Sequence, residues 1–135
     1  MALHKKGVRV CVMLNGAKAT GERPNDPFFE KMKSTGIEVQ WSNPSFLVTH
    51  ENSIIVDGKS ALLPTFNFME KYFRATRDYG VLTNDPVQVE QIQKCFDCDW
   101  KREPISSARR CRTRVEPGIC PSVCLQVNRS RSKNA

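Results

Sequence analysis

The order of apolar and polar side chains predicts a strand, a helix and a second strand at the start of the chain. Val8–Leu14 is mostly apolar and rich in valine, which is typical of a buried strand. A helix is predicted next, with Asp26 as its cap and Pro27 in its first turn, and it ends near Gly36. Ile37–Trp41 then alternates between apolar and polar positions, as a half-buried strand does. This order favours a β–α–β unit.

The middle of the chain predicts a β-hairpin. Ser53–Val56 is mostly β-branched and apolar, Asp57-Gly58 is a strong signal for a two-residue turn, and Ala61–Leu63 is apolar again. Such a hairpin puts His50 before the first strand and Asn67 beyond the end of the second. We therefore expect the side chains of His50 and Asn67 to reach one polar site.

A further strand and a helix complete the pattern. The pattern over Phe68–Thr76 fits either a loop or a short helix, whereas Tyr79–Thr83 is predicted to be a strand. Asn84–Pro86 then caps a helix whose apolar positions over Val87–Trp100 fall mostly at helical spacing. Strands alternating with helices predict an α/β fold in which helices flank a mixed β-sheet.

The apolar periodicity ends near Pro104. The prediction is therefore a domain over residues 1–103 followed by an irregular, basic and disordered tail over residues 104–135. The whole chain has a net charge of +7, of which residues 103–135 contribute +5. The tail is either a disordered arm that binds phosphates or a sequence without selected structure, and the second interpretation is favoured.

The spacing of polar residues around the hairpin resembles the phospholipase D superfamily, whose signature is H-x-K-x4-D-x6-G-S-x-N. His50, Asp57 and Asn67 stand at the histidine, aspartate and asparagine positions. Three positions differ from the signature, and they hold Asn52 for lysine, Pro64 for glycine and Thr65 for serine. The resemblance runs from about residue 7 to about residue 102. Within the superfamily, the chain resembles the bacterial, cardiolipin synthase-like members.

The resemblance implies a metal-independent, cofactor-free reaction that hydrolyses phosphodiester bonds. In the family, one histidine attacks phosphorus and forms a phosphohistidine, and a second histidine from another copy of the motif protonates the leaving oxygen. Mapped onto this chain, His50 is the nucleophile or the acid, and the polar groups around it have one role each. Asp78 orients the histidine, Asp57 ties the hairpin together, Thr65 and Asn67 bind the phosphate, and Asn52 weakens the site because it lacks the charge of a lysine.

The chain holds one copy of the motif. The resemblance therefore implies that the second copy comes from a homodimer or from a missing part of the chain. The first strand and helix of a family half-domain are also absent, so the chain resembles a fragment truncated at its N-terminus. The expected substrate is a phosphodiester, with a phospholipid head group ahead of nucleic acid. The alternatives are a non-catalytic module that binds phosphate or nucleic acid, and an inactive fragment of a larger enzyme with two motifs.

Other functional classes find little support in the sequence. A zinc site is conceivable from Cys95, Cys98, Cys120 and Cys124, but the second spacing is atypical and neither histidine is near, so no metal site is predicted. No signal peptide or membrane-spanning run is recognised. The larger aromatic side chains are assigned to the core rather than to lipid binding, and these are Phe28, Phe29, Phe66, Phe68 and Trp100.

Overall fold

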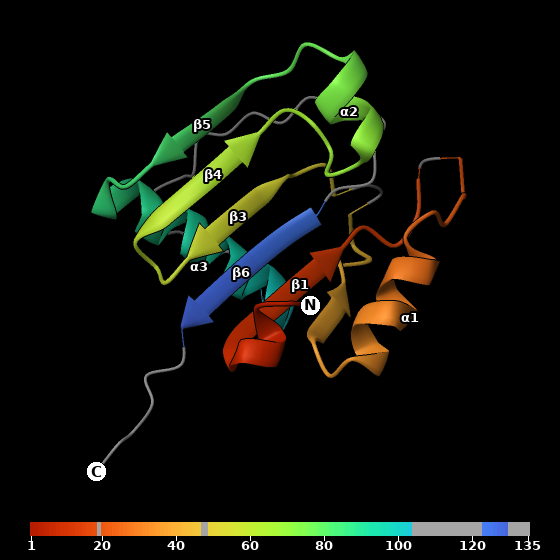
Figure 1. Ribbon diagram of the computed structural model, residues 1–135, viewed down its shortest axis with the longest axis horizontal. Helices are drawn as coiled ribbons and strands as arrows, with labels where there is room; N and C mark the ends of the chain where they lie inside the picture. Colours follow the sequence, from red (N-terminus) through yellow and green to blue (C-terminus); the bar gives the residue numbers. More distant parts are fainter. Residues whose placement is uncertain (19, 47–48, 104–122, 130–135) are drawn as a thin grey trace.

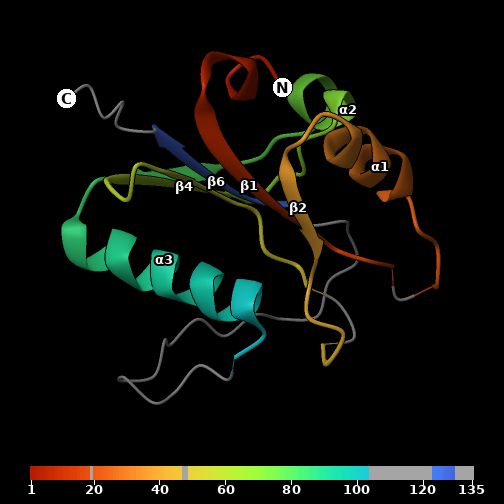
Figure 2. The same ribbon diagram turned by 90° about the horizontal axis from the view of Figure 1, so that it is seen from below.

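A computed structural model describes residues 1–18, 20–46, 49–103 and 123–129, and it shows a six-stranded sheet between two helical layers (Figures 1 and 2). Helices α1 and α2 lie on one face of the sheet, and α3 covers the other face. The sheet order is β2-β1-β6-β3-β4-β5. The elements are the short 3-10 helix His4–Lys6, β1 (Val8–Leu14), α1 (Asp26–Ser34), β2 (Glu38–Trp41), β3 (Ser53–Val56), β4 (Ser60–Pro64), α2 (Glu70–Ala75), β5 (Gly80–Thr83), α3 (Pro86–Lys101) and β6 (Val123–Arg129).

The predicted β–α–β unit is confirmed. β1 and β2 pair in parallel, from Cys11 opposite Glu38 to Leu14 opposite Trp41, with α1 between them in the chain. Proline stands in the first turn of α1 as expected, where its missing N–H costs nothing. The predicted cap was wrong by one residue, because Asp26 is already helical and Asn25 precedes it at the cap position.

The predicted hairpin is also confirmed. β3 and β4 are antiparallel, with Ile54 opposite Leu62. Both turn residues have left-handed backbones, with φ of 55° at Asp57 and 62° at Gly58. A two-residue turn of this hand matches the twist of the flanking strands, which is why an Asp-Gly pair signals it in sequence.

The central strand β6 comes from a stretch in which the sequence pattern predicts no strand. β6 pairs with β1 in antiparallel fashion over its whole length, from Val8 opposite Arg129 to Leu14 opposite Val123. On its other side it pairs with β3 in parallel. The rest of the predicted tail, residues 104–122 and 130–135, lies outside the described residues.

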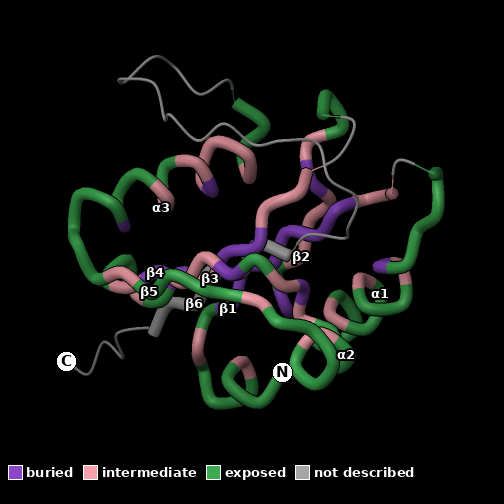
Figure 3. The backbone as a smooth tube through the Cα atoms, turned by 90° about the horizontal axis from the view of Figure 1, so that it is seen from above, coloured by how far each residue is buried: buried purple, intermediate pink, exposed green. Residues whose placement is uncertain are grey.

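Two apolar cores occupy the two faces of the sheet, and both depend on β1. The core under α3 joins buried Cys11 and Met13 to Ile55, Ala61, Val89 and Phe96. The core under α1 joins Val10, Val12, Leu14 and Ile37, with Phe29 and Trp41 packed against it. Among the described side chains, burial is concentrated on β1, β3 and β4 and on the inner side of α3 (Figure 3). β1 therefore presents alternate side chains to both cores.

The assignment of aromatic side chains to the core was wrong for Phe28, which is 55% exposed. Phe29, the next residue, instead packs inward and stacks on Trp41 at 4.1 Å between ring centroids. On the other face of the sheet, Trp100 packs against the α3 core as expected. Among the described residues no helix is long and apolar enough to span a membrane.

Candidate active site

Four of the signature positions, which hold His50, Asn52, Thr65 and Asn67, lie at one edge of the sheet, whereas Asp57 lies in the turn at the opposite end of the β3–β4 hairpin. Because β3 is antiparallel to both β4 and β1, the start of β3 lies beside the ends of β4 and β1. The chain segment with His50 and Asn52 enters β3 at this edge, and the segment with Thr65 and Asn67 leaves β4 there. The hairpin therefore brings together two halves of the signature that are distant in sequence, as its pattern predicts.

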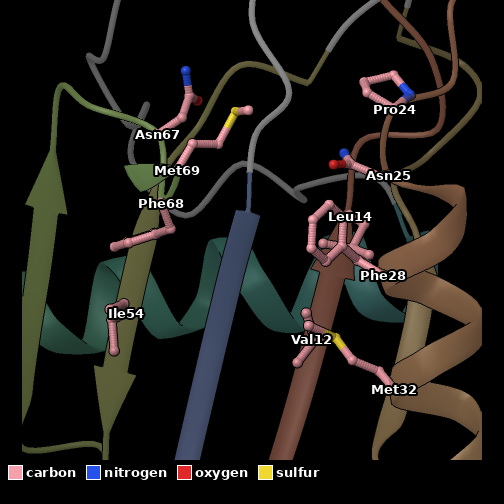
Figure 4. Close-up of a pocket in the computed structure, with 10 residues that line it drawn as sticks. All are labelled: Val12, Leu14, Pro24, Asn25, Phe28, Met32, Ile54, Asn67, Phe68 and Met69. Carbon is pink, nitrogen blue, oxygen red and sulfur yellow. The ribbon is translucent and has the colours of Figure 1, made fainter. Parts of the chain in front are cut away.

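Asn67 lines a cavity of about 280 Å³ at this edge (Figure 4). Its side chain is 4% exposed, and its Oδ1 atom is buried without a hydrogen-bond partner. The other lining residues are mostly apolar and come from the sheet, from α1 and from the segment before α2. They are Val12, Leu14, Pro24, Asn25, Phe28, Met32, Ile54, Phe68 and Met69.

His50 is half-buried and does not line the cavity that holds Asn67. In the described part of the chain, no hydrogen bond joins His50 to Asn67 or Thr65. Asn52, at the lysine position of the signature, is 7% exposed. The structure thus places His50 and Asn67 at the same sheet edge without a shared cavity.

Thr65 and Asp78 form a polar clamp between β4 and β5. The Thr65 hydroxyl lies 3.1 Å from Asp78 Oδ1 and 3.1 Å from the carbonyl oxygen of Tyr79, and it accepts a hydrogen bond from the Tyr79 N–H at 3.0 Å. The other oxygen of Asp78 accepts from the Thr76 hydroxyl. Asp78 therefore orients two threonines in this structure, and the expected orientation of His50 by Asp78 stays a prediction.

Asn15 is a site residue that the sequence analysis missed. It follows β1 and is buried, and its Oδ1 accepts hydrogen bonds from the Thr49 N–H at 3.3 Å and the Ser42 hydroxyl at 3.4 Å. Its own carbonyl oxygen accepts from Asn25 Nδ2 at 3.0 Å. Asn15 thus anchors the segment that leads into His50. A polar residue directly after a buried strand is the signal that could have revealed it.

Two acidic side chains lie on the side of α3. Burial raises the pKa of the Glu51 carboxyl; a hydrogen bond from Ser53 opposes this shift, and the negative charge of Asp99 adds to it. Burial also raises the pKa of Asp99. Neither residue belongs to the signature, although Glu51 directly follows His50.

Two arginines flank the same sheet edge beyond β2. Arg23 and Arg102 line a second hollow of about 370 Å³ with Asn15 and Trp41. The guanidinium of Arg23 lies 5.1 Å from the Trp41 ring centroid and forms an ion pair with Asp26 at 3.0 Å. These arginines are positive charges outside the signature.

Comparison with known proteins decides the family. A family model described as "Cardiolipin synthase, PLD-like domain" matches residues 1–100. The chain belongs to the phospholipase D-like family. The mitochondrial cardiolipin hydrolase of Chlamydomonas reinhardtii is 27% identical over 100 residues, which make up 74% of this chain and 43% of that protein. The chain therefore spans less than half the length of this curated relative. No solved structure matches it.

Membership of the phospholipase D-like family confirms the resemblance drawn from the signature. It places the chain in a family of phosphodiesterases, whose members act on phosphodiester substrates and typically pair two halves that each carry a motif. The α/β fold agrees with a partial domain of this kind.

No described cluster of three or more histidine, cysteine, aspartate or glutamate side chains could hold a metal ion. Cys11 is buried, and Cys95 and Cys98 lie on α3. Burial raises the pKa of the Cys11 thiol, which keeps it protonated. Cys120, which the conceivable zinc site would need, lies outside the described residues.

Proposed function

We propose that the chain is one half of a phospholipase D-type phosphodiesterase that hydrolyses phosphodiester bonds, with a phospholipid head group as the foremost substrate. The support is the family match over residues 1–100 together with the spacing of His50, Asp57 and Asn67. The observation that carries most weight is that the segment with His50 and the segment with Thr65 and Asn67 meet at one end of the β3–β4 hairpin.

In the proposed reaction a ring nitrogen of His50 attacks phosphorus, and the bond from phosphorus to the leaving oxygen breaks. A second imidazole, from another copy of the motif, gives its proton to the leaving oxygen. The same imidazole then takes a proton from water, which attacks phosphorus and releases His50. An imidazole suits both roles because it titrates near neutral pH. No step in this scheme uses a metal or another cofactor.

Asn67 and Thr65 are the proposed phosphate contacts. The Asn67 amide can donate to a phosphoryl oxygen through Nδ2. The Thr65 hydroxyl can do so only after it turns away from Asp78 and Tyr79, whose oxygen atoms lie within 3.1 Å of it. Asp57 fixes the turn of the hairpin, which holds β3 and β4 in register. In this scheme Asp78 positions Thr65. Its second proposed role is to orient His50.

Asn52 is the weak point of the proposed site. An amide at the lysine position can donate a hydrogen bond, but it brings no positive charge to the phosphoryl oxygens. By analogy with the loss of one oxyanion donor, this costs about 2.7–4 kcal/mol of transition-state stabilisation. The expected rate is therefore lower by roughly a hundredfold to a thousandfold.

The test is hydrolysis of a soluble aryl phosphodiester by the wild type and three variants. We expect Asn52→Lys to raise the rate by about a hundredfold or more, Asn52→Met not to raise it, and His50→Ala to abolish it. His4→Ala is the matched control because His4 is the other histidine of the chain and lies in the 3-10 helix. A folded Asn52→Lys protein that is no faster than the wild type would contradict the proposed site.

The second candidate is a non-catalytic module that keeps the fold and binds a phosphate. The engaged Thr65 hydroxyl and the uncharged Asn52 favour it, and Arg23 and Arg102 supply charge nearby. Binding of phosphate or nucleic acid that weakens steeply with salt, with no hydrolysis by wild type or Asn52→Lys, would support this candidate.

A further inference from the structure

We propose that the hollow lined by Arg23 and Arg102, which we call the arginine hollow, binds the phosphate group of a small phosphomonoester. It lies where the chain leaves β1 and β2, beside the end of α3 (Figure 2). None of the described residues at the signature positions lines it. The arginine hollow is therefore a separate site, and its ligand does not depend on the proposed reaction.

Both arginines keep hydrogen-bond donors that the described residues do not use. Arg23 donates to the two carboxylate oxygens of Asp26 only through Nε, at 3.1 and 3.0 Å, so its terminal nitrogens bond to no described residue. Arg102 bonds to described residues only through its backbone N–H. Even with Asp26 counted, the two guanidinium groups leave a net positive charge at the hollow. Planar guanidinium groups with unused donors suit the oxygens of a phosphate.

Contacts within the protein hold the wall of the arginine hollow in place. The guanidinium of Arg23 lies 5.1 Å from the ring centroid of Trp41, and Trp41 stacks on Phe29. Asn15 is buried, and its Oδ1 accepts a hydrogen bond from the Ser42 hydroxyl at 3.4 Å. Groups that are fixed before a ligand arrives lose less conformational freedom on binding.

The size and rim of the hollow favour a small ester over a bare phosphate ion. Its volume of about 370 Å³ is at the lower end of the range for small-molecule sites. Pro44 and Phe46 form an apolar part of the lining, and Phe46 is 56% exposed. A small organic group on the phosphate can cover Phe46 while the phosphate contacts the arginines. A monoester carries about 1.5 to 2 negative charges at neutral pH, so two guanidinium groups favour it over a singly charged diester.

Gly16 offers a way to change the charge of the hollow without disturbing the fold. It lines the hollow, and a Cβ added at this position meets no atom within 4 Å. Its backbone is not in the left-handed region, so other residues can adopt it. Glutamate at position 16 adds a negative charge beside the arginines, whereas glutamine of the same shape adds none.

The first experiment measures binding of phenyl phosphate to the whole chain by titration calorimetry. Gly16→Glu and Arg102→Gln should each weaken binding by at least about tenfold, and Gly16→Gln by less than about threefold. Arg74→Gln is the matched control and should bind like the wild type, because Arg74 is 77% exposed on α2 and does not line the hollow. No binding by the wild type, or wild-type affinity in Gly16→Glu or Arg102→Gln, would overturn the proposal.

The second experiment tests the ester group. Inorganic phosphate and dimethyl phosphate should each bind the wild type more weakly than phenyl phosphate, the first because it lacks the ring and the second because it carries one charge. In Phe46→Ala, inorganic phosphate and phenyl phosphate should bind with similar affinity. Phenol, which has a ring and no phosphate, should not bind. Phenol that binds as tightly as phenyl phosphate, or a diester that binds more tightly than the monoester, would refute a phosphomonoester site.

The third experiment separates the arginine hollow from the signature. His50→Ala should bind phenyl phosphate like the wild type, because His50 does not line the hollow. If His50→Ala loses binding while Gly16→Glu keeps it, the phosphate sits at the signature and the proposal fails. Hydrolysis of the aryl phosphodiester without binding of phenyl phosphate would remove the arginine hollow as a site and leave the proposed function standing. Binding without hydrolysis would do the reverse.

Discussion

The buried side chain of Asn67 lowers the stability of the fold, although the proposed function uses it. A buried acceptor without a partner costs about 1–3 kcal/mol, which is a large share of the stability of a small domain. Unpaired buried polar groups are rare in native structures, and under the proposed function this one belongs to a residue of the substrate site. The neighbouring Asn52 is buried as well, and it provides no charge where the family signature has a lysine.

Glu51 should make stability fall as pH rises. Burial raises the pKa of the Glu51 carboxyl in the folded state. Above its ordinary pKa of 4.5, the carboxyl therefore ionises more readily in the unfolded chain, which stabilises the unfolded chain relative to the folded one. We expect Glu51→Gln to unfold like the wild type below that pH and to be more stable near neutral pH.

Urea denaturation of both proteins at pH of about 4 and about 7 measures this difference. Glu30→Gln, at an exposed position of α1, is the control and should show no such change with pH. A Glu51→Gln protein that is less stable than the wild type at neutral pH would show that the Ser53 hydrogen bond matters more than burial.

Local residue chemistry explains which site features the sequence could predict. The turn at Asp57-Gly58 and the cap of α3, where Asp85 accepts from the Val87 N–H at 2.8 Å, depend on neighbours in sequence. The link from Thr65 to Asp78 and the effect of Asp99 on Glu51 depend on how distant segments pack. A single sequence without long-range information does not show such contacts.

At the scale of elements, apolar patterning and local turn and cap residues predicted β1 to β5 and both longer helices, because these signals lie within or beside each element. The segment of α2 stayed ambiguous, since a helix of six residues is too short to show a period. β6 escaped prediction for a different reason. It follows a long stretch with prolines and arginines and shows no period of its own, and its partners β1 and β3 are far away in sequence.

Breaking β6 should unfold the whole sheet. Gln126 stands opposite Cys11 of β1 and Ile55 of β3, so proline at this position removes a ladder donor between two strands. We expect Gln126→Pro to lose at least about 2 kcal/mol, and Gln126→Thr, which keeps the N–H, to lose little. Thermal unfolding followed by circular dichroism measures both. Equal stability of the wild type and Gln126→Pro would mean that the N-terminal domain does not need this strand.

For the whole molecule, the proposed function requires a second copy of the motif beside the one in this sequence. Family members typically pair two motif-bearing halves, and a homodimer is the simplest source of the second half. The edge strand β5 also exposes apolar side chains, among them Val81 and Leu82, which are 62% and 74% exposed.

Mixing experiments can show whether the second histidine comes from another chain. The experiment uses Asn52→Lys protein mixed with a ninefold excess of chains that also carry His50→Ala. Only about one tenth of the intact chains then pair with an intact partner, so activity per intact chain should fall to roughly a tenth. An excess of His4→Ala chains is the control and should leave activity unchanged. If the His50→Ala excess also has no effect, each chain works alone and the homodimer proposal fails.

The place of β6 has a consequence for how the protein is made. Among the described strands β6 is the last to leave the ribosome, yet it is the strand that joins β1 to β3. Until it emerges, the nascent polypeptide holds two separate pieces of sheet with open edges, which other chains could capture. The strand order therefore makes closure of the full sheet wait for the last described strand, whose pairing with β1 spans most of the chain.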